Sequence, residues 1–293
     1  MSASPATSGR QAARALTVTD ISAERRWWRV DWREIWRHRE LVRALAWRDL
    51  KVRYRQAALG VLWAVLTPVV TMLVFDVLFG RLAPIDTGDT PYPVFSLAGL
   101  LAWRLYQGAV TQAGSSLVRA RTLVSRLYCP RLLVPLAATL PPIVDFAVAF
   151  VVLVALLGYY RLPVGLSLLA LPVVVGVTVL AALGVGLFVA AASARYHDVE
   201  HVFGFAMQTL LFLSPIIYPA DKVYSFLEAH GLPAWCYGLN PVTGVIESFR
   251  WCVLGEPPAS FAALLASLAT SVTLFAIGLV YFSKHEDTLA DYL

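Results

Sequence analysis

Two apolar segments of this chain are too long to be buried inside a soluble domain. Residues 147–157 read AVAFVVLVALL and residues 168–192 read LLALPVVVGVTVLAALGVGLFVAAA, with no charged side chain in either. The second segment has the length of a bilayer-crossing helix, which needs about 20 mostly apolar residues, and the first is the end of a longer apolar stretch, residues 132–157. The whole chain is 58% hydrophobic and only 15% charged, whereas soluble domains contain about a quarter charged residues. The sequence therefore predicts a polytopic membrane protein.

Six apolar segments predict an all-α fold with six transmembrane helices. The first contains about 21 residues, which gives a helix of about 31 Å and matches the hydrocarbon thickness of a bilayer. Residues 219–258 are less apolar and contain two short helical patterns divided by Pro233 and Pro241. We expect these to be re-entrant helices between spans five and six. The predicted spans are residues 59–79, 94–113, 132–157, 166–192, 202–218 and 261–282.

The distribution of charge predicts the orientation of the chain in the membrane. Thirteen of the 24 Lys and Arg residues precede Gly60, and four more arginines lie within residues 119–131. The positive-inside rule places both regions in the cytoplasm, and the short loop with Asp86 and Asp89 then lies outside. With six spans, both termini are cytoplasmic. A net charge of +5 is also compatible with nucleic-acid binding, but no basic groove interleaved with stacking aromatics is visible.

The region before the first span divides into two parts. Residues 1–26 lack the apolar core of a signal peptide and are expected to form a disordered cytosolic tail. Residues 27–58 place tryptophans on one helical stripe and arginines on another, which predicts an amphipathic helix in the membrane interface. The alternative, a soluble amphipathic helix, needs a cytosolic core that the chain does not supply. The tryptophans of this stripe are Trp28, Trp32 and Trp36.

The sequence lacks the motifs of several enzyme classes. There is no GxxxxGK motif followed by Ser or Thr, so we expect no ATP hydrolysis by this chain alone, and there is no GxSxG motif. His197 and His201 have a spacing that resembles a metal site, but their position at a span end favours an ordinary polar turn. We expect no metal or cofactor on this chain. Cys236 and Cys252 are expected to be unpaired, although pairing on the outer side stays open.

Charged residues at membrane depth are hypotheses for function, because a charge in lipid is costly. Asp145 lies deepest by sequence, and Arg104 and Asp76 are the others. One interpretation makes Asp145 a proton-relay carboxylate of a secondary transporter. The favoured interpretation makes it a structural partner of Arg104 or of backbone groups near the prolines, because no second acid or histidine accompanies it.

Several stretches together resemble the polysaccharide-exporting type-2 ABC transporter permeases. They are LAWRDLKVRYRQAALGVLWAVLTPV, LVSRLYCPRLLVP, ARYHDV, SPIIYP and LNPVTGVIESFRW, in the order of that family and within residues 41–293. The resemblance implies the membrane subunit of an exporter that moves a lipid-linked glycan of the O-antigen, teichoic acid or cell-wall galactan type. It also implies a homodimer of permeases in a bacterial inner membrane, with two copies of a separate ATPase subunit that bind ATP and Mg.

The resemblance assigns roles to particular segments. Residues 27–58 correspond to the gate helix at the cytoplasmic entrance, and residues 219–254 to re-entrant helices that shape the external gate. A coupling helix after the second span and the ARYHDV stretch correspond to ATPase contacts. The implied coupling residues are Arg119, Arg121, Leu123, Arg126, Tyr128, Arg131, Arg195 and Asp198.

Aromatic rings are expected to line the pathway, because the apolar faces of sugars slide along them. The candidates are Trp63, Phe75, Phe79, Phe203, Phe205 and Phe212, although each one alone is also explained by core packing or lipid contact. The alternative function is a multispan glycosyl- or acyltransferase acting on polyprenyl-linked sugars, with Asp221, Glu247 and Arg250 as its only polar candidates. A third hypothesis is a non-catalytic scaffold of a cell-wall assembly complex.

Overall fold

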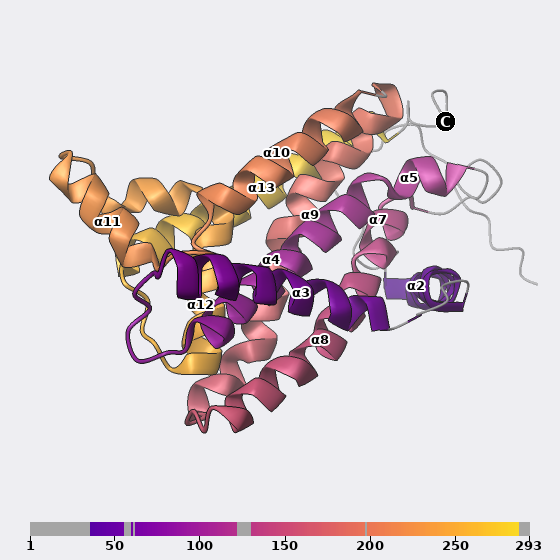
Figure 1. The fold of residues 1–293 in the computed structure, drawn as a ribbon. Helices are drawn as coiled ribbons and strands as arrows, with labels where there is room; N and C mark the ends of the chain where they lie inside the picture. Colours follow the sequence, from indigo (N-terminus) through magenta and orange to yellow (C-terminus); the bar gives the residue numbers. More distant parts are fainter. Residues whose placement is uncertain (1–35, 56–59, 61, 122–129, 197, 287–293) are drawn as a thin grey trace, which may run out of the picture.

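The computed structural model describes residues 36–55, 60, 62–121, 130–196 and 198–286. Every regular element within these ranges is a helix, so the all-α expectation is confirmed for this part of the chain. Figure 1 shows a bundle in which α4, Tyr92–Gly114, lies near the centre. Residues 1–26, together with Trp28 and Trp32 of the predicted interfacial stripe, lie outside the described residues.

Four helical segments of the described chain are long and apolar enough to cross a membrane. They correspond to the first, third, fourth and sixth predicted spans, with ends shifted by a few residues. The first continues into a π-helix, and the third is divided at Thr139. In order they are α3 (Leu62–Phe75) with η1 (Asp76–Leu82), α7 (Leu133–Ala138) with α8 (Leu140–Tyr159), η2 (Leu166–Ala170) with α9 (Leu171–Arg195), and α13 (Phe261–His285).

The other two predicted spans are helical but differ in character. Helix α4 has 23 residues and covers the second predicted span, with Arg104 and two glutamines reducing its apolarity. Helix α10, Val199–Leu213, has only 15 residues and is apolar. The helix ends before Ser214, whereas the predicted fifth span runs on to residue 218. Ser214 has an extended backbone, as expected for a residue that precedes a proline.

Helix α4 supplies much of the core of the bundle. Its side chains Trp103 and Tyr106 are almost completely buried. The helix contacts α3, α8, α9 and α12, and most of its 23 residues are buried. Neighbouring helices therefore cover most of α4, whereas Arg104, Gln107 and Gln112 are half-buried and Thr111 is exposed.

Helices α9 and α13 approach each other closely at a pair of glycines. A Cβ at Gly184 would overlap the backbone of Phe275, and a Cβ at Gly278 would overlap the carbonyl of Gly184. Small residues at such a crossing allow two backbones to approach within van der Waals contact. This contact requires glycine at both positions.

Residues 219–258 form two α-helices joined by a short 3₁₀ helix. They are α11 (Ala220–Ala229), η3 (Ala234–Leu239) and α12 (Pro241–Leu254). The side chain of Asn240 accepts a hydrogen bond from the Val242 backbone N–H and caps α12, and Gly255 ends that helix with φ of 75°. The two helices expected between the fifth and sixth spans are therefore present, and α12 is largely buried.

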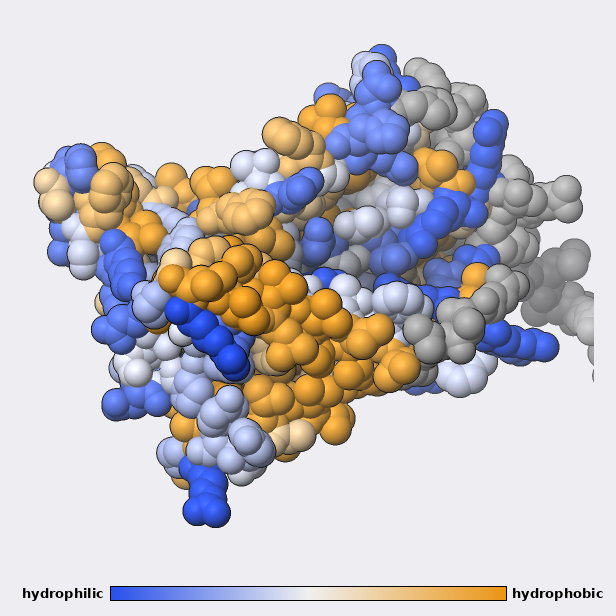
Figure 2. Space-filling model, viewed as in Figure 1, coloured by the Kyte–Doolittle hydropathy of each residue, from blue (hydrophilic) through white to orange (hydrophobic). Residues whose placement is uncertain are grey.

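Helix α2, Arg39–Arg55, packs across the end of the bundle (Figure 1). Val42 and Leu45 join Leu133 and Val134 of α7 in one apolar cluster. Trp36 precedes the helix and is 72% exposed, and its interfacial position stays a prediction. Figure 2 shows an apolar surface over α3 and hydrophilic residues gathered around α2 and α5, Ser116–Arg119.

We expect Gly184→Ala to destabilise the protein by about 1–3 kcal/mol, because the added methyl group must separate the backbones of α9 and α13. Heat-induced unfolding of the purified protein in detergent measures the effect. Gly176→Ala on the same helix is the matched control, since a Cβ there meets nothing within 4 Å. Equal stability of the two variants would contradict the close contact.

Candidate substrate cavity and coupling surface

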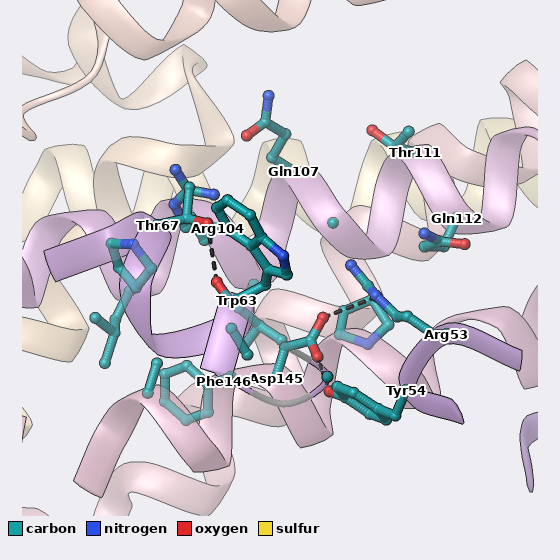
Figure 3. A pocket seen from close by; sticks show the side chains of 18 residues that line it. Arg53, Tyr54, Trp63, Thr67, Arg104, Gln107, Thr111, Gln112, Asp145 and Phe146 are labelled. Carbon is teal, nitrogen blue, oxygen red and sulfur yellow. Dashed lines mark hydrogen bonds and ion pairs between the residues drawn. The ribbon is translucent and has the colours of Figure 1, made fainter. Parts of the chain in front are cut away.

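A cavity of about 540 Å³ opens between α2, α3, α4 and α8. One wall carries Trp63, Ala64 and Pro68 of α3, and another carries Pro142 and Phe146 of α8. Helix α4 contributes a polar stripe, and α2 contributes Arg53 and Tyr54 (Figure 3). The residues of the α4 stripe are Arg104, Gln107, Thr111 and Gln112. The cavity thus combines apolar and polar walls, as binding sites for small molecules commonly do.

Asp145 connects α8 to α2 at one end of this cavity. Its carboxylate forms an ion pair of 2.8 Å with the Arg53 guanidinium and accepts a hydrogen bond from the Tyr54 hydroxyl (Figure 3). Burial and the hydrogen bond to Asp145 raise the pKa of Tyr54. The expected partnership of Asp145 with Arg104 is wrong, because Arg53 and Tyr54 of α2 reach this carboxylate instead.

Arg104 lies on the wall of the same cavity without a partner among the described residues. Its Nε atom is buried and has no hydrogen-bond acceptor there, and Figure 3 shows the side chain beside Thr67 of α3. Thr67 uses its own hydroxyl to donate to the Trp63 carbonyl at 2.9 Å. Within the described residues, no carboxylate forms an ion pair with this guanidinium.

A second cavity of about 340 Å³ adjoins the first and shares Arg53 and Gln112 with it. Arg119 lines this second cavity and donates a hydrogen bond of 2.8 Å to the Gln112 carbonyl. Arg48 also lines it and pairs with Asp49 at 2.9 Å. Burial lowers the pKa of Arg119, which is the direction expected when a cation is removed from water. The two cavities form a basic region at the end of the bundle where α2 and α5 lie.

The predicted coupling residues occupy the same end of the molecule where they are described. Arg119 ends α5, and Arg121 is exposed just after it. The backbone N–H of Arg131 donates to a carboxylate oxygen of Glu286 at 3.1 Å. Arg195 ends α9, with its guanidinium 5.3 Å from the ring centre of Tyr196, and Asp198 precedes α10. Leu123, Arg126 and Tyr128 lie outside the described residues, as does His197.

The six predicted pathway aromatics divide into two groups. Trp63, Phe205 and Phe212 are exposed, with between 53% and 73% of their surfaces accessible, and Trp63 lines the larger cavity. The remaining three, Phe75, Phe79 and Phe203, pack partly buried against the core. Phe75 and Phe79 also contact each other edge to face, with ring centres 6.0 Å apart. A pathway role stays a prediction for all six.

Two of the three polar residues proposed for an enzymatic site, Glu247 and Arg250, hold α12 in place, and the third, Asp221, is exposed on α11. Glu247 accepts a hydrogen bond of 3.0 Å from the Tyr224 hydroxyl of α11. Arg250 lies 3.5 Å from the ring centre of Phe95 and donates to the Ile216 carbonyl at 3.0 Å. Both charged side chains are buried, so they lack the open arrangement that a catalytic pair needs. Cys236 and Cys252 are free thiols in the structure.

The polar wall of the larger cavity was missed as a site by sequence reasoning, although it has a sequence signal. Arg104, Gln107 and Thr111 are separated by three and four residues, which places them on one helix face. No sequence pattern indicates that Arg53 and Tyr54 line the cavity, because only the packing of the bundle brings α2 to it. Asp76, the third predicted membrane charge, pairs with Arg81 at 3.3 Å.

We expect Asp145→Asn to loosen the attachment of α2 to α8, because the substitution removes the ion pair with Arg53. Backbone hydrogen exchange across residues 39–55 should become faster. The pair is partly exposed, so the coupling energy in a double-mutant cycle with Arg53→Gln should be about 1 kcal/mol or less. Asp89→Asn in an exposed turn should leave this exchange unchanged, and unaltered exchange in Asp145→Asn would contradict the attachment.

Comparison with known proteins places this arrangement in a family. The chain is 26% identical over 257 residues to the O-antigen export system permease protein RfbA of Myxococcus xanthus, covering 87% of this chain and 96% of the relative. It is 23% identical to the O-antigen export system permease protein RfbA of Klebsiella pneumoniae, and the match covers 84% of this chain and 92% of the relative. It is also 23% identical to the polysialic acid transport protein KpsM of Escherichia coli, and that match covers 85% of this chain and 94% of the relative. The ABC-2 type transporter pattern matches residues 40–254, and the chain therefore belongs to the ABC-2 type transporter family.

Proposed function

We propose that this protein is the membrane subunit of an ATP-driven exporter of a polysaccharide. The observation that carries the proposal is the nearly full-length similarity to permeases named for O-antigen export and polysialic acid transport. The cavity agrees with it, since its polar stripe on α4 and its apolar walls from α3 and α8 suit a substrate with both kinds of surface. The proposed substrate is a lipid-linked glycan of the O-antigen, teichoic acid or cell-wall galactan type.

We propose six membrane spans with both termini in the cytoplasm of a bacterium. In this proposal, α4 and α10 are the second and fifth spans, in addition to the four long apolar segments. Helices α11 and α12 form the re-entrant pair. Because α10 has 15 residues, it covers about 22 Å as a helix, and the turn after it must provide the remaining depth. The arginines of α2 and of residues 119–131 support this orientation in the inner membrane.

The proposed assembly contains two permeases and two copies of a separate ATPase subunit. ATP and Mg belong to the ATPase subunits, because the permease sequence has no phosphate-binding motif. Residues 119–131, with Arg195 and Asp198, form the proposed coupling surface. This segment is connected directly to the cavities, because Arg119 donates a hydrogen bond to the Gln112 carbonyl of α4 and Gln112 lines both cavities. A movement of the segment can therefore change the shape of the cavities.

The basic coupling surface predicts an effect of charge reversal at Arg121. We expect Arg121→Glu to reduce glycan export by the permease reconstituted with its ATPase at least tenfold, because the exposed cation is replaced where the ATPase is proposed to dock. Export into vesicles and co-purification of the ATPase measure the effect. Arg161→Glu is the matched control, since Arg161 is also exposed but follows the far end of α8.

Three outcomes would contradict parts of the proposed function. Undiminished export by Arg121→Glu would remove this residue from the coupling surface. Chemical turnover of a polyprenyl-linked sugar by the purified permease without any ATPase would favour the alternative of a glycosyl- or acyltransferase. Absence of glycan export by the wild-type permease with its cognate ATPase would contradict the exporter itself.

A further inference from the structure

A buried turn without helical backbone separates α10 from α11. Residues 214–219 read SPIIYP, and both Ser214 and Ile216 are fully buried. An unpaired backbone carbonyl in an apolar environment is costly, so the carbonyls of such a turn need donors from elsewhere. The two prolines also remove two backbone N–H groups from the segment. The turn therefore depends on the side chains that surround it.

Four carbonyls at this turn each accept a side-chain hydrogen bond of 3.0 Å. Three of the four donors come from other elements, namely α4, η3 and α12. The turn is thus fixed from several sides at once, although it has no regular backbone pairing of its own. The donor and acceptor pairs are Tyr218 to Phe212, Tyr237 to Leu213, Arg250 to Ile216 and Tyr92 to Ile217.

Arg250 of α12 joins the turn to α4. Its guanidinium lies 3.5 Å from the centre of the Phe95 ring of α4 while it donates to the Ile216 carbonyl. A cation over an aromatic ring is attracted to it. Gly99 of α4 leaves the space for this contact, since a Cβ there would lie 2.8 Å from Nη2 of Arg250 and 3.3 Å from the Ile216 backbone. Three elements therefore meet at one guanidinium.

Helix α10 is packed loosely along the rest of its length. Among its 15 residues only Met207 is buried, and Figure 1 shows the helix along one side of the bundle. The opposite end of α10 begins at Val199, directly after Asp198 of the proposed coupling surface. A segment with few buried contacts moves more easily than a well-packed one. The helix is thus held firmly at the turn and weakly elsewhere.

We propose that Arg250 is a positioning residue of export, which fixes residues 214–219 as the pivot for movements of α10. A displacement that the ATPase causes at the start of α10 then rotates the helix, because its other end stays in place. Without Arg250 the turn moves as well, and the displacement is lost before it changes the pathway. The inference rests on the proposed function, since the ATPase supplies the displacement.

The permease reconstituted with its ATPase in vesicles tests this role. Arg250→Met removes the charge and the donor but keeps a long side chain, and a buried cation often tolerates such a replacement. We expect ATP hydrolysis to continue, while the glycan exported per ATP hydrolysed falls about tenfold, as for the loss of one hydrogen bond to a charged group. Arg250→Lys should restore part of the ratio, because lysine keeps the cation over the Phe95 ring.

Gly99→Ala tests the same pivot from α4 without changing Arg250. The added methyl group should push the guanidinium and the turn away from α4 and lower the same ratio. Gly176→Ala is its matched control, because a Cβ there meets nothing within 4 Å. Arg161→Met, which replaces an exposed arginine, is the control for Arg250→Met. Both controls should keep the wild-type ratio.

Backbone hydrogen exchange at residues 216–218 reports on the pivot independently of export. Exchange should be faster than in the wild type in both Arg250→Met and Gly99→Ala, and unchanged in the two controls. Wild-type exchange in Arg250→Met would overturn the pivot whatever the export result. If the wild-type permease exports no glycan with its ATPase, the proposed function fails, and exchange still decides whether Arg250 fixes the turn.

Two further results would overturn the positioning role. One is a wild-type ratio of export to ATP hydrolysis in both Arg250→Met and Gly99→Ala. The other is a parallel fall of export and ATP hydrolysis, with loss of the co-purified ATPase, which shows that Arg250 serves only the fold. If Arg250→Met does not fold, the ratios of Arg250→Lys and Gly99→Ala decide, and wild-type ratios in both reject the proposal.

Discussion

The burial of α4 is the constraint on which the rest of the structure depends. This helix carries an arginine and two glutamines in its second half, and these groups cannot face hydrocarbon without a large cost. Helices α3, α8, α9 and α12 surround it, so its apolar half forms the core and its polar stripe faces a cavity. The arrangement leaves a polar space inside a bundle whose outer surface over α3 is apolar.

The cost of leaving a charge without a partner in an apolar environment also accounts for the charged residues elsewhere in the bundle. Arg250 is covered by the Phe95 ring and by a backbone carbonyl, and Glu247 is held by Tyr224. Asp145 is neutralised by α2. Each of these charges has a partner in the structure and fixes one element against another. Arg104 differs because no carboxylate of the described chain forms an ion pair with it.

The cavity also gives the coupling surface a mechanical connection to the substrate. Arg119 bonds to the backbone of Gln112, and Arg53 lines both cavities while it holds Asp145. A displacement of α5 or α2 therefore changes the shape of the space beside α4. Helix α2 packs on α7 through the apolar cluster of Val42 and Leu45, and it reaches α8 through the Arg53 ion pair and the Tyr54 hydrogen bond.

The helical class and most of the span positions could be predicted from the sequence, because continuous apolar runs and prolines act locally. The end of α10 had a local signal in Pro215, which disfavours helix at Ser214, but the predicted span continued past it because Ile216 and Ile217 are again apolar. The polar face of α4 was readable from the spacing of Arg104, Gln107 and Thr111. The partner of Asp145 could not be predicted from the sequence. Arg53 is distant from Asp145 along the chain, and the packing of α2 on α7 brings the two side chains together.

The sequence by itself determined that the chain is helical, apolar enough for a membrane and basic at one end. These properties follow from the local cost of exposing backbone and charge to hydrocarbon. Only the tertiary structure decided which charges are paired, because pairing depends on the approach of helices that are far apart along the chain. Asp145 therefore belongs to the attachment of α2, while Arg104 is left facing the cavity, and no local pattern distinguishes the two.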